Sequence, residues 1–175
     1  MGDYVRKIRD FERQRNALSD AIRQTVERRR ESPAKYQEWK NAAAAFATHH
    51  SPLDPLFAQC FYASAQPVTP DLRAFMFDYI AVDPQFFRSG YILERILRRI
   101  KKLALSRSEK RAVQKLLVTR VKERGLRNFR DICRLVPVIE DGSLRTEIEN
   151  LACSDHDGIR HRARFALSYF GTGGR

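Results

Sequence analysis

The sequence predicts an all-α protein that consists of a long N-terminal helix followed by antiparallel helical hairpins. Glycine and proline are scarce, with 8 and 7 copies among 175 residues, whereas an all-β domain with many tight turns needs more of both. Apolar residues recur at three- and four-residue spacing along most of the chain, which is the period of an amphipathic helix. Four capping residues each precede a proline: Ser32, Ser51, Thr69 and Asp83.

These four dipeptides predict where helices begin. A Ser, Thr or Asp oxygen can accept a hydrogen bond from a free amide of the first turn, and proline suits the first helical position. With the apolar spacing that follows each pair, we expect helices over residues 33–48, 52–65, 70–82 and 84–105. Gly90 can break the last of these helices.

The N-terminal helix is predicted over residues 3–30. Its apolar residues follow a 3-4 alternation, which Arg15 interrupts: Tyr4, Ile8, Phe11, Leu18 and Ile22. A narrow apolar seam of this kind packs along the body of a protein or pairs with another chain. We therefore treat residues 1–31 as an arm or dimerisation element, residues 32–170 as a helical domain and residues 171–175 as a disordered tail.

Further helices complete the predicted domain. A capping-box pattern, Ser-x-x-Glu, precedes the first of them, and Pro137 interrupts or ends the second. We expect these helices from Ser106 to Gly125, over 128–139, after Asp141, and over 157–170.

The net charge of +12 is concentrated in one stretch of chain. Residues 92–130 hold 14 Lys and Arg against 3 Asp and Glu, which gives this segment a charge of +11. Such asymmetry indicates a polyanionic partner, either nucleic acid or an anionic membrane surface. A solvated face that serves only solubility is the alternative.

The cations of this segment form two stripes on consecutive predicted helices. Each helix has its own inward apolar stripe, so the charge belongs to folded structure and not to a basic tail. We expect seven of these side chains to contact nucleic-acid phosphates: Arg95, Arg98, Arg99, Lys102, Arg111, Lys115 and Lys122. Phosphate contacts supply affinity and positioning but carry little sequence specificity.

We expect residues 143–170 to form two short antiparallel helices joined by a turn. The second helix follows Asp157, opens with an aliphatic–arginine pair, Ile159-Arg160, and continues with small residues at helical spacing, Ala163 and Ala166. This pattern resembles one unit of a HEAT-type helical repeat.

The resemblance implies a short HEAT-like solenoid, with an irregular helical bundle as the alternative. Asp155 or Asp157 could cap the second helix, and Arg160 could reach an aspartate across the turn. Residues 107–139 form another helix pair of similar length but lack the aspartate-to-arginine signature. Solenoids need several stacked repeats to bury a continuous core, and only one unit matches.

The sequence contains no phosphate-binding glycine loop and no metal-ligand spacing, so we expect no enzyme, no cofactor and no metal site. The three cysteines, Cys60, Cys133 and Cys153, are widely spaced and lie in apolar contexts. They are expected to be buried thiols in a reducing compartment. No run approaches the roughly 20 apolar residues that span a bilayer, and we expect a cytoplasmic protein.

The sequence therefore favours a non-enzymatic helical module with a basic face that binds nucleic acid with little sequence specificity. The alternative is a protein–protein interaction scaffold of HEAT-like type, or a homodimer that forms through the N-terminal helix. Binding to an anionic membrane ranks last, because the apolar stripe of the basic segment is needed for the fold.

Overall fold

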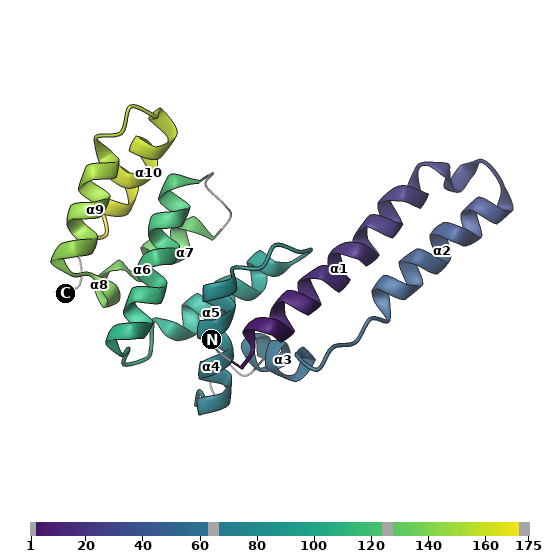
Figure 1. Ribbon diagram of the computed structural model, residues 1–175, viewed down its shortest axis with the longest axis horizontal. Coiled ribbons are helices and arrows are strands. Elements are labelled where there is room, and N and C mark those ends of the chain that lie inside the picture. Colours follow the sequence, from purple (N-terminus) through teal and green to yellow (C-terminus); the bar gives the residue numbers. More distant parts are fainter. Residues whose placement is uncertain (1–2, 63–66, 124–127, 172–175) are drawn as a thin grey trace. The chain divides into compact units, whose positions relative to one another are not determined.

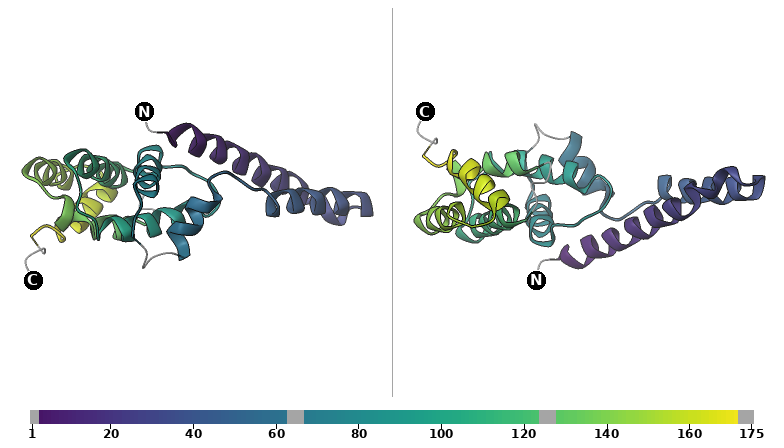
Figure 2. Two further views of the ribbon diagram at one scale, coloured as in Figure 1. Left: turned by 90° about the horizontal axis from the view of Figure 1, so that it is seen from below. Right: turned by 90° about the horizontal axis from the view of Figure 1, so that it is seen from above.

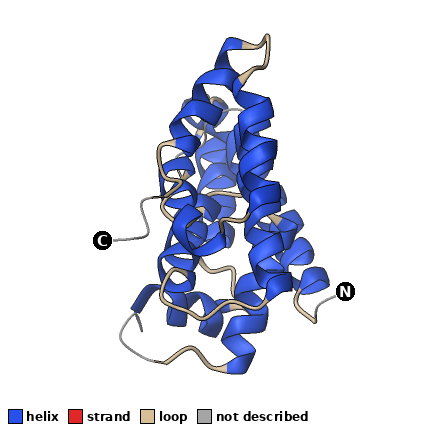
Figure 3. Ribbon diagram, turned by 90° about the vertical axis from the view of Figure 1, so that its left-hand side faces the viewer, coloured by secondary structure: helices blue, strands red, loops and turns tan. Residues whose placement is uncertain are grey.

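A computed structural model describes residues 3–62, 67–123 and 128–171 of the chain. All regular structure within these ranges is helical, as predicted (Figure 3). The chain divides into two compact units at Ser89–Gly90. The first unit therefore joins the long N-terminal helix to the three helices that follow it, whereas the sequence pattern had set residues 1–31 apart from the rest.

The first unit is built on a helical hairpin. α1 and α2 run antiparallel and side by side (Figures 1 and 2), linked by a short 3-10 turn, η1. The long N-terminal helix is thereby confirmed. The elements of this unit are α1 (Val5–Val26), η1 (Arg28–Arg30), α2 (Pro33–Ala47), α3 (Asp54–Tyr62) and α4 (Pro70–Val82).

The core of the first unit is aromatic and lies at one end of this hairpin. Phe11 of α1 contacts Phe57 of α3, with ring centroids 5.1 Å apart, and Phe57 contacts Phe75 of α4 at 5.6 Å. Ile8 and Phe11 are the buried residues of α1, and none of the residues of α2 is buried. The far half of the hairpin is thus a two-helix arm whose apolar side chains stay partly exposed.

Arg15, which interrupts the apolar seam of α1, fastens this helix to the end of α2. Its Nη1 donates a hydrogen bond of 2.8 Å to the carbonyl oxygen of Phe46. Its guanidinium carbon also lies 3.7 Å from the centroid of the Phe46 ring, within the range of a cation–π contact. The break in the seam is therefore a contact between the two helices.

The second unit is a cluster of shorter helices around α6. In the structure α6 contacts α7, α8, α9 and α10, while α9 and α10 lie side by side (Figure 1). Its buried apolar residues include Leu117, Ile132, Ile148, Ala163 and Ala166. The helices are α5 (Ser89–Ile100), α6 (Arg107–Lys122), α7 (Phe129–Cys133), α8 (Val136–Ile139), α9 (Gly142–Ala152) and α10 (Asp157–Leu167).

Three of the predicted caps form as expected. The side chains of Ser32 and Thr69 each accept a hydrogen bond of 3.2 Å from the amide three residues later. Ser106 and Glu109 form a complete capping box at the start of α6. After Ser51 the helix begins only at Asp54, because the Ser51 hydroxyl and the Asp54 carboxylate bond to nearby amides and form a turn first.

The prediction of a helix start at Asp83-Pro84 is wrong. Asp83 ends α4 in the left-handed conformation, with φ 48°, and its amide donates to the carbonyl oxygen of Tyr79. Aspartate tolerates this conformation better than most residues, so the same dipeptide serves as a stop. The next helix, α5, begins at Ser89 and ends at Ile100.

The single helix predicted over residues 128–139 is two short helices. α7 ends at Cys133, and Pro137 lies in the first turn of α8, where its missing amide costs nothing. The predicted helix end at Gly125 and residues 172–175 of the predicted tail lie outside the described residues.

Replacing Arg15 with Ala should destabilise the protein by about 1–2 kcal/mol, because it removes a charged hydrogen bond and a cation–π contact. Urea unfolding followed by the fluorescence of Trp39, the one tryptophan of the chain, reports on this unit. Arg13→Ala is the matched control, since Arg13 lies on the same helix with a side chain 79% exposed and a local pair to Asp10. Equal losses in the two variants would contradict the fastening role of Arg15.

Candidate nucleic-acid interface

A surface groove of about 380 Å³ lies between α6 and α9 in the second unit. α6 supplies one wall and the first turns of α9 supply the other. The residues that line it are Arg111, Gln114, Lys115, Val118, Thr119 and Lys122 from α6, and Ser143, Leu144 and Glu147 from α9. The groove thus gathers three of the seven cations that the sequence singled out.

These three cations come from one face of α6. Arg111, Lys115 and Lys122 are spaced by four and seven residues, which places them in one row along a helix. All three are exposed, while Val118 between them is buried and forms apolar floor. The outer stripe that the sequence predicted on this helix is therefore one wall of a groove.

Hydrogen bonds at the N-terminal cap of α9 hold this helix, the opposite wall of the groove, against α6. Asp141 accepts a hydrogen bond of 2.8 Å from the amide of Leu144, and its other carboxylate oxygen accepts one of 2.9 Å from Nε2 of Gln114. The same amide nitrogen donates to the carbonyl oxygen of Ile139 at 2.7 Å. Gln114 therefore ties the start of α9 to the middle of α6.

The hydrogen bonds to Asp141 also fix its charge. The Leu144 amide and the Gln114 side chain, with a smaller contribution from Arg111, hold the pKa of this carboxyl below its ordinary value. Asp141 is thus an anion beside the groove at neutral pH. Inside the groove, Glu147 lies 3.4 Å from Nζ of Lys122, so the lining carries three cations against one carboxylate.

Arg162 of α10 closes the end of α6 next to Lys122. Its Nε donates a hydrogen bond of 2.9 Å to the carbonyl oxygen of Val121, and its Nη2 lies 3.4 Å from the carbonyl oxygen of Lys122. These carbonyls have no partner within the helix. Arg162 therefore orders the last turn of α6, from which Lys122 extends.

The cations of α5 behave differently, and none of them lines the groove. Arg98 bonds to Glu94 at 2.5 Å and lies 3.9 Å from Asp131, so its charge is partly neutralised within the unit. Arg95 is exposed, and Lys102, which the sequence pattern placed on the same helix, is exposed in the turn just after α5.

The expectation that Arg99 contacts phosphate is corrected by its burial, because only 6% of this residue is exposed. Arg99 lies three residues after Ile96 and four before Leu103, which puts it on the inward side of α5. The burial of Arg99 could therefore have been predicted from the spacing of apolar residues in the sequence.

The sequence interpretation did not identify the polar residues that line the groove beside the cations. It also did not identify the burial of one cation of α6, Arg120. Gln114 and Thr119 lie one helical turn from predicted cations on α6, so periodicity could have found them. Ser143 depends on the packing of α9, which no local pattern shows. Arg120 is 2% exposed and donates to Glu123 at 3.3 Å, so its charge belongs to the fold.

The turn before α10 matches the expected pattern only in part. Arg160 pairs with Asp157, as expected, and its Nη1 donates a hydrogen bond of 2.7 Å to the carbonyl oxygen of Ser154. The cap position is held by His156, without a side-chain hydrogen bond. Neither Asp155 nor Asp157 therefore acts as the side-chain cap.

The cysteines differ from one another in exposure. Cys60 and Cys133 are buried, but the prediction of a buried thiol is wrong for Cys153, which is exposed at the end of α9. Within the described ranges there is no cluster of three His, Cys, Asp or Glu side chains with the geometry of a metal site. In that same part of the chain, no helix combines the length and apolarity needed to cross a bilayer.

Comparison of the chain with protein-family models, with curated proteins and with solved structures finds no match.

Replacing Arg162 with Ala should lower the free energy of unfolding by about 1–3 kcal/mol, because two carbonyl oxygens at the end of α6 lose a charged donor. The free energy of unfolding of Arg162→Lys should lie between those of Arg162→Ala and the native protein, since lysine keeps the charge but lacks the several donors of a guanidinium. Arg164→Ala, an exposed position on the same helix, is the control and should change stability by less than about 0.5 kcal/mol. A loss in the control as large as that in Arg162→Ala would argue against the capping role.

The cap at Asp141 should make part of the stability depend on pH. The folded pKa is depressed, so the stabilisation is complete above the unfolded value of about 3.9 and is lost as the pH falls through the folded value. Asp141→Ala should therefore cost about 1 kcal/mol at neutral pH and progressively less below about pH 4. The measurement is urea unfolding of both proteins across this range, and a cost that stays constant with pH would contradict it.

Proposed function

We propose that this protein is a non-enzymatic, cytoplasmic interaction module that binds nucleic acid through phosphate contacts in the α6–α9 groove. The observation that carries the proposal is the row of Arg111, Lys115 and Lys122 on one face of α6, all exposed and all lining one groove. In our proposal residues 143–170 act as a HEAT-like hairpin that supplies the other wall.

The dimensions of the row suit a sugar-phosphate backbone. Arg111 and Lys122 are eleven positions apart, which is about 16 Å along a helix. A nucleic-acid strand advances about 3.4 Å per nucleotide in duplex DNA, so the row spans about five steps. In this proposal the three cations contact phosphates, and such contacts carry no direct sequence information, which favours binding with little sequence specificity.

The other groups of the groove fit the same ligand. The hydroxyls of Thr119 and Ser143 are donors of the kind that bond to phosphate oxygens. Glu147 opposes the ligand, because it holds Lys122 at 3.4 Å and repels an approaching phosphate. Lys122 must exchange Glu147 for phosphate on binding, so this carboxylate moderates the affinity.

Removing the three groove cations should weaken binding and flatten its salt dependence. The triple variant Arg111→Ala, Lys115→Ala, Lys122→Ala should lose at least about tenfold in affinity for a short duplex at about 50 mM salt, and its log–log salt slope should fall by roughly 2–3. The measurement is fluorescence anisotropy of a labelled duplex over a salt series, with helix content checked by circular dichroism.

The matched control is the triple variant Arg95→Ala, Arg98→Ala, Lys102→Ala, which removes the same number of cations from α5 and the turn that follows it. If the groove is the site, this control should change the salt slope by less than about 1. Equal losses in both triple variants would show that net charge, and not the groove, governs binding, and would overturn the proposal.

Neutralising Glu147 should have the opposite effect. Glu147→Gln frees Lys122 and removes a repulsive charge from the groove, so the affinity for the same duplex should rise roughly two- to fivefold. The gain should be smaller in the Lys122→Ala background, because only the removal of the repulsive charge then contributes. Weaker binding by Glu147→Gln in the native background would contradict this account of the groove.

A further inference from the structure

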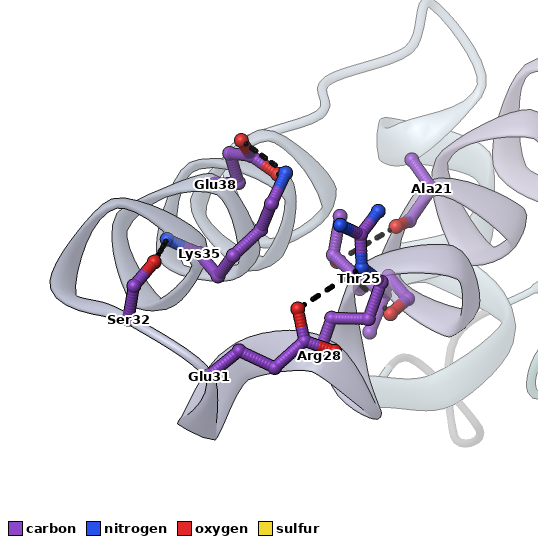
Figure 4. A network of polar contacts seen from close by, with 8 residues as sticks. Ala21, Thr25, Arg28, Glu31, Ser32, Lys35 and Glu38 are labelled. Atoms are coloured by element: carbon purple, nitrogen blue, oxygen red, sulfur yellow. Dashed lines mark hydrogen bonds and ion pairs between the residues drawn. The ribbon is translucent and has the colours of Figure 1, made fainter.

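The far end of the α1–α2 hairpin carries a second group of cations, together with exposed aromatic side chains. Figure 4 shows the polar contacts at this end, where η1 joins the two helices. Residues 28–40 hold five Lys and Arg against two Glu, a charge of +3. We call this segment the hairpin tip. It belongs to the first unit, whereas the α6–α9 groove belongs to the second.

Many ionic groups near the tip are engaged locally. Lys35 bonds to both carboxylate oxygens of Glu38, at 2.8 and 2.7 Å, and Arg28 bonds to Glu31 at 3.3 Å (Figure 4). These pairs use both carboxylates of the tip. Arg30 and Lys40 are exposed, and the structure shows no ion pair for either of them within the described residues.

Two aromatic rings and a guanidinium lie close together on the same segment. The ring centroids of Tyr36 and Trp39 lie 5.6 Å apart, and the guanidinium carbon of Arg29 lies 5.4 Å from the Trp39 ring. Tyr36 is 50% exposed, so part of its ring has no cover. Lys40 lies one turn from Tyr36 on the same face of α2.

This surface contributes little to the fold. α2 buries none of its residues, and Tyr36 lies far along the helix from the aromatic core around Phe11. An exposed ring on a segment that also carries exposed cations is a recurring surface for single-stranded nucleic acid, in which bases stack on aromatic side chains and phosphates contact Lys and Arg. The hairpin tip has both an exposed aromatic ring, Tyr36, and exposed cations, Arg30 and Lys40.

We propose that the hairpin tip binds single-stranded nucleic acid, with a base stacked on Tyr36 and the flanking phosphates held by Arg30 and Lys40. A second copy of this chain is disfavoured as the occupant, because symmetric pairing would bring two +3 tips together. An acidic peptide would satisfy the cations but would leave the exposed ring without a stacking partner. The inference does not depend on the groove of the second unit.

Trp39 provides a direct probe of this site, because it is the only tryptophan of the chain and contacts Tyr36. An oligothymidylate of about 20 nucleotides should quench Trp39 fluorescence at low salt. Tyr36→Ala should weaken this binding about tenfold, and Tyr36→Phe should restore it, because phenylalanine keeps the stacking face. Arg30→Ala with Lys40→Ala should reduce the salt slope by roughly 1–2.

The triple groove variant Arg111→Ala, Lys115→Ala, Lys122→Ala separates this inference from the proposed function. It should lose affinity for a duplex and keep the oligothymidylate quench, whereas Tyr36→Ala should do the reverse. Failure of one proposal thus leaves the other measurable.

Three outcomes would overturn the inference. The first is no quench of Trp39, or one that Tyr36→Ala leaves unchanged. The second is a quench by polyglutamate as strong as that by oligothymidylate, which would make the tip a general anion or acidic-peptide site. The third is a dimer in light scattering of the full chain that Tyr36→Ala dissociates, which would assign the exposed ring to a second copy.

Discussion

The carbonyl oxygens in the last turn of a helix have no amide partner within that helix, and this protein supplies donors to several of them with arginine side chains. Arg15 bonds to the carbonyl of Phe46 at the end of α2, and Arg162 bonds to those of Val121 and Lys122 at the end of α6. Arg160 bonds to that of Ser154, just beyond α9. The bonds of Arg15 and Arg162 each place a cation at the negative end of a helix dipole, whereas the Ser154 carbonyl lies in the turn after α9.

These contacts also hold elements together. Glycine, the usual residue for closing a helix, is scarce in this chain, and an arginine that reaches from a neighbouring helix does two tasks at once. Arg15 joins the two helices of the hairpin, and Arg162 joins α10 to α6. The last turn of α6 and the pairing of the two hairpin helices both use this one type of hydrogen bond.

The burial and ion pairing of other arginines limit how much of the net charge reaches the surface. The charge of +12 suggests a strongly basic surface, but part of it is internal. Arg99 and Arg120 are buried, and Arg98 is shared between Glu94 and Asp131. The cations left for a partner are therefore fewer than the net charge suggests, and they include the three of the α6–α9 groove and two at the hairpin tip.

Local chemistry explains which parts of the fold could be predicted. Ser32, Thr69 and Ser106 cap their helices as expected, because the signal and the contact are within three residues of each other. The row on α6 followed from periodicity for the same reason. Asp83 was misassigned because Asp before Pro suits both a helix start and a left-handed stop, and only the neighbouring structure decides between them.

The parts that could not be predicted depend on contacts between distant segments. No local pattern shows that Ser143 and Glu147 face α6, or that Arg15 meets Phe46. The burial of Arg99 could have been predicted from its spacing to Ile96 and Leu103. It was assigned to the surface because neighbouring residues in the sequence are also cations. The likeness of residues 143–170 to a HEAT-type unit stays a prediction.

Arginine-closed helix ends have a practical consequence for handling the protein. A bond between a guanidinium and a partly buried carbonyl is screened little by salt, whereas contacts to phosphates in solution weaken steeply as salt rises. High ionic strength should therefore strip bound polyanions from the protein while its helices remain closed. If the protein binds nucleic acid as we propose, a salt wash should free purified material of it without any need for refolding.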